Sequence, residues 1–213
     1  MNSSIIQNLF IDGPAGKLEV ILGEPRSIPK GLAIIAHPHP LHGGTMDNKV
    51  IHTLFTTLLE LEFIVAKFNF RGVGKSEGVY DHGRGETEDA ITIAQMLRHQ
   101  FNDHTADLLP LLLAGFSFGG AIQLHAAKQL NPEYLILIAP SVVNLDAPSV
   151  PETAQYALII QGDRDDIVLP DRLLAWATPQ SQPITFIPGA EHFFHGKLAI
   201  LKQVILNAFK NRI

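Results

Sequence analysis

A single serine flanked by glycines follows one of the most apolar stretches of the chain. Ser117 is the centre of GFSFG, residues 115–119, and the run LLPLLLAGF leads directly into it. A strand is expected to end at Phe116 and a helix to begin at Phe118. This strand–turn–helix context with small flanking residues is what an exposed nucleophilic serine requires. The pattern predicts that Ser117 is a nucleophile, and the alternative is an ordinary turn serine.

A second G-x-S-x-G match, GKSEG at residues 74–78, competes with the first one. Ser76 lies several residues beyond its predicted strand and continues into the loop sequence EGVYDHGRG. We therefore expect Ser76 to bond nearby backbone groups in a turn.

Two later loops could activate the serine. A serine hydroxyl is a weak nucleophile until a base removes its proton, and a carboxylate usually orients that base. The loop GDRDDIV at residues 162–168 and the loop AEHFFH at residues 190–195 follow predicted strands in the order serine, acid, histidine. The candidate acids are Asp163, Asp165 and Asp166, and the candidate bases are His192 and His195.

Short apolar runs alternate with amphipathic segments along the whole chain. The predicted strands are Ile5–Ile11, Leu18–Leu22, Gly31–Ala36, Phe63–Phe70, Leu108–Phe116, Tyr134–Ala139, Tyr156–Gln161 and Ile184–Ile187. The predicted helices are Asp47–Leu61, Thr87–Gln100, Phe118–Leu130, Asp171–Ala177 and Lys197–Asn211. Strands that are apolar throughout are covered on both faces. The order predicts a single α/β domain over residues 1–213, with a mostly parallel central sheet, helices on both faces and ligands at the carboxyl ends of the strands.

Composition excludes several classes of function. The 213 residues carry a formal net charge of −5 and contain no cysteine, which excludes disulfides and cysteine-ligated metals. No long basic run favours nucleic acid or an anionic membrane surface. The N-terminus lacks the charge pattern of a secretory signal, and we expect a cytoplasmic protein.

Four stretches together resemble the α/β-hydrolases, specifically the small lidless kind similar to dienelactone hydrolases and short-chain esterases. They are AHPHPLHGGT (36–45), FNFRGVGKSEG (68–78), AGFSFGG (114–120) and the pair GDRDDIVLP with PGAEHFF. The resemblance implies an α/β-hydrolase fold without a cap domain. The family pattern G-x-x-D-x-x-V places the acid at Asp165, and the pattern G-x-x-H-F places the base at His192. Asp163, Asp166 and His195 remain the alternatives.

Acyl transfer also needs two backbone N–H groups directed at the developing oxyanion. One is expected from Phe118, the residue after the nucleophile. In the resembling hydrolases the other comes from the loop after the strand Gly31–Ala36, and register places it at His39 between two prolines that have no N–H. A metal site at His37, His39 and His42 is the competing hypothesis, and we expect these histidines instead to line the rim of the site and bond backbone groups.

The sequence as a whole predicts a serine hydrolase that cleaves a carboxylic ester or related acyl bond without a cofactor or metal. About fifteen residues between the strands that end near Ala139 and begin near Tyr156 are too few for a helical cap, so we expect an open site for small or exposed acyl groups. The alternatives are a thioesterase or small peptidase with the same triad, a non-catalytic binding module and a metal-dependent enzyme. The expected partner is a small-molecule acyl substrate, with no nucleic acid and no membrane, and a homo-oligomer stays open.

Overall fold

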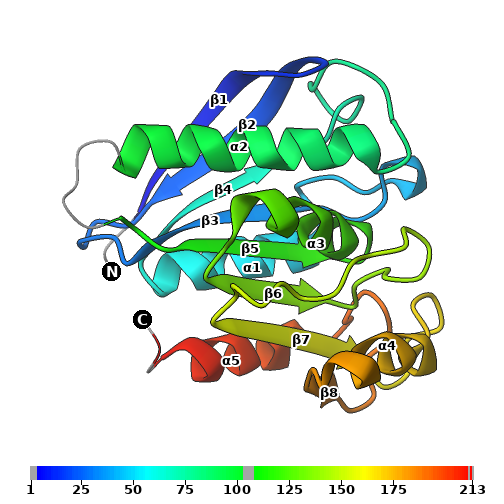
Figure 1. Ribbon diagram of the computed structural model, residues 1–213. Helices are drawn as coiled ribbons and strands as arrows, with labels where there is room; N and C mark the ends of the chain where they lie inside the picture. The colour runs from blue at the N-terminus through cyan, green and yellow to red at the C-terminus, as the bar shows by residue number, and fades with distance from the viewer. Residues whose placement is uncertain (1–3, 103–107, 211, 213) are drawn as a thin grey trace.

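The computed structural model describes residues 4–102, 108–210 and 212 and folds them around an eight-stranded sheet (Figure 1). The strand order is β1-β2-β4-β3-β5-β6-β7-β8. Strand β2 runs antiparallel to both of its neighbours, and the pairs from β4 to β8 are parallel. The strands are β1 (Ile5–Gly13), β2 (Gly16–Glu24), β3 (Gly31–Ala36), β4 (Phe63–Phe68), β5 (Leu111–Phe116), β6 (Tyr134–Ile138), β7 (Tyr156–Gly162) and β8 (Ile184–Ile187).

Helices cover both faces of the sheet. They are α1 (Lys49–Glu60), α2 (Arg84–Asn102), α3 (Phe118–Leu130), α4 (Pro170–Ala177) and α5 (Leu198–Phe209), with short 3₁₀ turns at η1 (Pro40–His42) and η2 (Thr178–Gln180). Helices α2 and α3 lie on the near side in Figure 1, and α1 and α5 lie behind the sheet.

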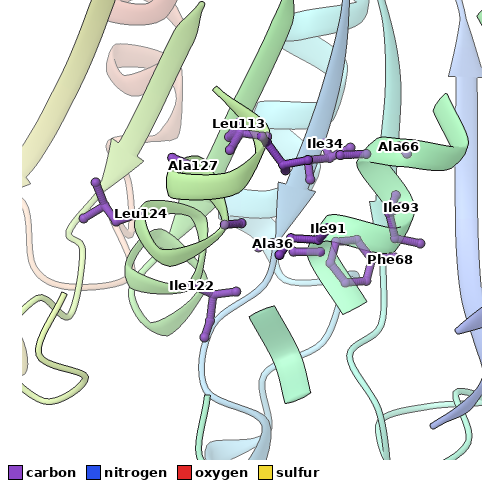
Figure 2. Packing of buried hydrophobic residues seen from close by; sticks show 14 of the residues in the cluster. Ile34, Ala36, Ala66, Phe68, Ile91, Ile93, Leu113, Ile122, Leu124 and Ala127 are labelled. Carbon is purple, nitrogen blue, oxygen red and sulfur yellow. The ribbon is translucent and has the colours of Figure 1, made fainter. Parts of the chain in front are cut away.

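The alternation of side chains along each buried strand creates two apolar cores. In β3, Leu32 and Ile34 pack with residues of α2 and α3, whereas Ala33 and Ile35 pack with α1 and α5. Figure 2 shows part of the first core, where Ile34 and Phe68 of the sheet approach side chains of the covering helices. Because both faces are covered, all six residues of β3 are buried. The predicted mostly parallel sheet with helices on both faces is confirmed.

Several element ends differ from the predicted ones for local reasons. Strand β4 ends at Phe68 rather than Phe70, because the Phe70 N–H leaves the sheet and bonds the His37 ring. Helix α2 begins at Arg84 rather than Thr87, because Asp81 and Glu86 accept N–H groups around its first turn.

The predicted last helix also has different ends. It begins at Leu198 rather than Lys197, and it ends at Phe209. Residue Asn211, its predicted last residue, lies outside the described residues.

A buried ion pair fixes the loop after β4 to helix α2. The Arg71 guanidinium donates through Nε and Nη2 to the Asp89 carboxylate, with Nη2 2.8 Å from Oδ1. Both side chains are almost inaccessible, at 8% for Arg71 and 0% for Asp89. Each charge thus has a partner in place of water, and Arg71 Nη2 also lies 3.3 Å from Glu88 Oε2. Losing Arg71 would leave the Asp89 carboxylate buried without a charged partner, and losing Asp89 would leave Arg71 only the exposed Glu88.

The order in which consecutive strands are added to the sheet reverses between β3 and β5. These two strands are neighbours in the centre of the sheet, although β4 lies between them in sequence. Helix α1 follows β3 on one face, and α2 precedes β5 on the other. A crevice forms at the carboxyl ends of the strands at such a switch point. The loop after β3 and the turn at Ser117 therefore open into the same crevice.

The connection from β6 to β7 contains no helix across residues 139–155, all of which the structure describes. The predicted absence of a cap domain is confirmed. Across the described ranges, every helix is too short or too polar to cross a membrane.

Candidate active site

Ser117 occupies a sharp turn between β5 and α3. Its backbone angles are φ 55° and ψ −117°, a region that residues with side chains rarely adopt. The turn is held from both sides, since the Ser117 N–H donates to Ile138 O at 2.9 Å and the Ser117 carbonyl accepts from Ser141 N at 3.0 Å. This strained conformation, of order 1–3 kcal/mol, is maintained by the surrounding sheet.

The glycines around the serine allow close backbone contacts. A Cβ at Gly115 would overlap the backbone of Gly119, and a Cβ at Gly119 would overlap the carbonyl groups of Ala36 and His37. The first turn of α3 therefore lies directly against the end of β3. This contact brings the Phe118 amide next to the loop that carries His39.

Ser117, His192 and Asp165 form one chain of hydrogen-bonding distances. His192 Nε2 lies 3.1 Å from Ser117 Oγ, and His192 Nδ1 lies 2.8 Å from Asp165 Oδ2. All three residues are buried, and the imidazole packs against the ring of Phe116 at 4.9 Å. Because a carboxylate accepts at Nδ1, the proton belongs on Nδ1 and Nε2 is free to accept from the serine hydroxyl.

The Asp165 carboxylate accepts four hydrogen bonds. Oδ1 accepts from the N–H groups of Ile167 and Val168 at 2.9 and 2.8 Å, and Oδ2 accepts from Gln161 Nε2 at 3.0 Å as well as from His192. Both oxygens are thus held in place, so the acid cannot rotate away from the imidazole.

The competing acids have other positions. Asp163 Oδ1 accepts from Gly189 N at 2.6 Å and so ties the acid loop to the histidine loop, and Asp166 is exposed. Asp165 is the member of this aspartate cluster that meets His192.

The competing serine and base also lie elsewhere. Ser76 Oγ donates to Asn69 O and accepts from Glu19 N, so it joins β2 to the loop after β4. His195 is exposed in the turn before α5, which begins at Leu198.

The predicted oxyanion donors are the backbone N–H groups of Phe118 and His39. Among residues 4–102, 108–210 and 212, neither the Phe118 N–H nor the His39 N–H donates to a protein acceptor. The two residues are neighbours, with ring centroids 4.8 Å apart. The tight turn at Pro40–His42 fixes the loop, since His42 N and Gly44 N both donate to His39 O. The N–H groups of Phe118 and His39 therefore stay the predicted donors to a developing oxyanion.

The three histidines of the loop after β3 do different things. His37 is fully buried; its Nε2 accepts from Phe70 N at 3.1 Å and its Nδ1 donates to Pro38 O at 2.7 Å. Burial lowers the pKa of His37 to about 4. The expectation that His37 bonds backbone groups is correct, but its expected place on the rim is wrong, because its ring turns inward to satisfy Phe70.

His39 and His42 stack on each other, with ring centroids 4.4 Å apart. His39 Nδ1 accepts from Leu41 N. The pKa of His39 is lowered mainly by burial and, to a smaller extent, by charge repulsion from His42. Over the described part of the chain, no three His, Asp or Glu side chains gather in an arrangement that could hold a metal ion.

A small pocket of about 110 Å³ opens beside the serine. One wall comes from the loop after β3 and the other from the acid and histidine loops, where Ile167 and Phe193 lie 57% and 41% exposed. The pocket is lined by Pro38, His39, His42, Gly43, Gly44, Asn48, Ser117, Ile167, His192 and Phe193. None of these residues is an aspartate, glutamate, lysine or arginine. The pocket therefore suits a small uncharged group.

Sequence reasoning missed two residues near this site. Gln161 bonds the acid directly, and Tyr80 places its hydroxyl 3.3 Å from His39 Nε2. A glutamine at the end of an otherwise apolar strand was the available signal for the first. Tyr80 lies in a loop 41 residues from His39 in sequence, and no pattern linked them.

Comparison with known proteins places these features in a family. Residues 36–163 match the family model described as serine aminopeptidase, S33. A solved α/β serine hydrolase homologue from Coxiella burnetii is 40% identical, with a TM-score of 0.86 over 95% of this chain and 96% of that one. A lidless α/β serine hydrolase from Xanthomonas campestris is 38% identical, with a TM-score of 0.88 over 96% and 94%. Rat monoglyceride lipase is 28% identical over 152 residues, which are 70% of this chain and 46% of the lipase.

Proposed function

Because this chain belongs to the α/β serine hydrolases, in the family described as serine aminopeptidase S33, we propose that it hydrolyses small carboxylic esters through Ser117, His192 and Asp165. The observation that carries the proposal is the unbroken line from Ser117 Oγ through the His192 ring to Asp165 Oδ2, with distances of 3.1 and 2.8 Å. A nucleophile, a base and an orienting carboxylate at these distances have the geometry of covalent acyl transfer.

In the first half of the proposed reaction, Ser117 Oγ attacks the ester carbonyl carbon and its proton passes to His192 Nε2. The N–H groups of Phe118 and His39 donate to the oxyanion that forms. The tetrahedral intermediate then collapses, the carbon–oxygen bond to the alcohol breaks, and His192 protonates the leaving oxygen. The product is an acyl group on Ser117 and a free alcohol.

In the second half, His192 Nε2 removes a proton from water as the water oxygen attacks the acyl carbon. Collapse of this second intermediate breaks the bond to Ser117 Oγ, which recovers its proton from His192. Asp165 remains ionised throughout and stabilises the imidazolium in both halves.

The lining of the pocket supports a neutral ester rather than a peptide with a free N-terminus. An aminopeptidase needs an acidic group near the scissile bond to bind the substrate ammonium, because a buried charge requires a partner. None of the residues lining the pocket beside Ser117 is acidic. The small volume of about 110 Å³ favours short acyl groups, and the exposed side chains of Ile167 and Phe193 extend the apolar surface outward.

The proposal is tested with p-nitrophenyl esters of increasing acyl length, with a thioester and an aminoacyl p-nitroanilide as further substrates. We expect wild type to prefer short acyl esters and to cleave the p-nitroanilide poorly. Ser117→Ala removes the nucleophile and is expected to lower kcat by at least about 10⁴-fold.

Ser76→Ala is the matched control, since it removes the serine of the second G-x-S-x-G pattern, and it should retain wild-type kcat. Hydrolysis that persists in Ser117→Ala would refute the mechanism. A p-nitroanilide cleaved faster than any ester would move the substrate class to peptides, and a thioester cleaved fastest would move it to thioesters.

A further inference from the structure

Gln161, near the end of β7, contacts the middle and the far end of the loop that carries the acid. Its Nε2 donates to Asp165 Oδ2 at 3.0 Å and to Val168 O at 2.7 Å. The side chain is completely buried. One amide group therefore fixes the position of Asp165 and closes the loop from 161 to 168.

The other half of the same amide is unpaired. Gln161 Oε1 is buried and has no hydrogen-bond partner among the described residues. The orientation of the amide is nonetheless defined, because both nearby partners are acceptors and only the NH₂ end can serve them. A buried unpaired carbonyl is costly. An apolar side chain of the same length would avoid that cost, so the amide is explained by what its NH₂ group holds.

From these contacts we infer that Gln161 is a positioning residue for the Ser117–His192–Asp165 triad. Asp165 Oδ2 receives two donors, Gln161 Nε2 and His192 Nδ1. The Gln161 amide holds Asp165 Oδ2 toward the imidazole and stabilises part of the negative charge of the carboxylate. Without that donor, Oδ2 loses one of its two anchors, and the Asp165–His192 contact is held less firmly. The inference rests on the proposed function for its kinetic consequence, but the contact itself exists without substrate.

The chain offers a close control in Gln123 of α3. Gln123 is equally buried, its Nε2 also donates to two acceptors, Ala114 O and Ile34 O, and its Oε1 is also unpaired. Its acceptors are carbonyl groups of the sheet rather than the acid. Gln161→Met and Gln123→Met thus remove the same chemical group from equally buried sites, and only the first touches the triad.

The experiment measures kcat, KM and thermal stability for both variants on the preferred short-chain ester. We expect Gln161→Met to lower kcat about tenfold or more, the factor for a weakened hydrogen bond to a charged group, with KM unchanged. Gln123→Met should keep kcat within about twofold of wild type even though its melting temperature also falls, which separates loss of a buried amide from loss of the contact with the triad.

A second readout does not depend on turnover. The His192 Nδ1 proton is observed by proton NMR and assigned by its absence in His192→Phe. The signal should shift or broaden in Gln161→Met and stay in place in Gln123→Met. Unchanged kcat and an unchanged signal in Gln161→Met would overturn the inference, as would equal losses of kcat in the two variants. If Ser117→Ala retains ester hydrolysis, the proposed function fails, and the NMR signal still tests the contact.

Discussion

Low pH should destabilise this protein through His37, which is not one of the three proposed catalytic residues. The ring is fully buried behind the loop that carries the His39 amide. Its Nε2 must stay unprotonated to accept from Phe70 N, and its Nδ1 already donates to Pro38 O. Burial lowers the pKa of His37 from 6.5 to about 4, against a smaller opposite effect of the bond to Pro38.

The sign and size of the effect follow from linkage. In the unfolded chain His37 takes up a proton near pH 6.5, whereas in the folded chain it does so only near pH 4. Between these values the unfolded state binds more protons, so the free energy of unfolding falls as the pH falls through this window. The full effect is about 3 kcal/mol, reached near pH 4, and this group contributes no further change below it.

The assay is urea unfolding followed by circular dichroism from pH 7 to pH 4, on wild type and His37→Gln. The glutamine carbonyl can accept from Phe70 N and does not titrate. Other histidines and carboxylates titrate in both proteins, so the informative quantity is the difference between the two stability curves. We expect wild type to lose about 3 kcal/mol relative to the variant on acidification. Parallel curves would refute the argument, because they would show that burial of His37 imposes no cost on its protonation.

Three further predictions concern the site and its support. Asp165→Asn should lower kcat by about 10⁴-fold, because the two N–H groups that bond Oδ1 would turn the new NH₂ group toward His192 and impose the wrong imidazole tautomer. Asp163→Asn should retain most of the activity, and steady-state kinetics of both variants test the prediction. Gly119→Ala should lower the free energy of unfolding by about 2 kcal/mol or more in urea titrations, because its Cβ overlaps backbone carbonyls, and an unchanged midpoint would contradict that contact. Asp89→Ala should cost about 3–5 kcal/mol of stability by leaving the Arg71 guanidinium buried without its main partner, measured in the same way. A loss below about 1 kcal/mol would contradict this, because it would mean that Glu88 or water compensates the Arg71 charge.

Most of the fold could be predicted from the sequence, because each strand is an apolar run bounded by turn residues. Gly31–Ala36 and Ile184–Ile187 have the predicted ends, and so does the helix Phe118–Leu130. These elements are set by local pattern, and their order along the chain dictates the parallel sheet. The ends that differ, at Phe68 and Arg84, are decided by side chains bonding backbone groups, which hydrophobic pattern does not register.

The triad candidates followed from the order of loops along the sheet, but choosing among neighbours needed more than spacing. Asp163, Asp165 and Asp166 are chemically equivalent in sequence, and the family resemblance favoured Asp165. Only the three-dimensional arrangement shows that Asp163 bonds Gly189 while Asp165 bonds His192.

Two other features are set by side-chain hydrogen bonds that hydrophobic pattern does not predict. No pattern links Gln161 to the acid, and the inward turn of His37 depends on the N–H of Phe70, which lies in the loop after β4, 33 residues later.

The absence of a helix in the connection between β6 and β7 has a consequence for the kinetics. Residues 139–155 form no helix, so no segment of that connection has to swing aside before substrate reaches Ser117 or product departs. Turnover should then be insensitive to added viscogens unless encounter itself limits the rate. In the proposed acyl-enzyme, the lack of a cap also leaves the acyl group open to water from outside, which favours release of the free acid over transfer of the acyl group to a competing alcohol.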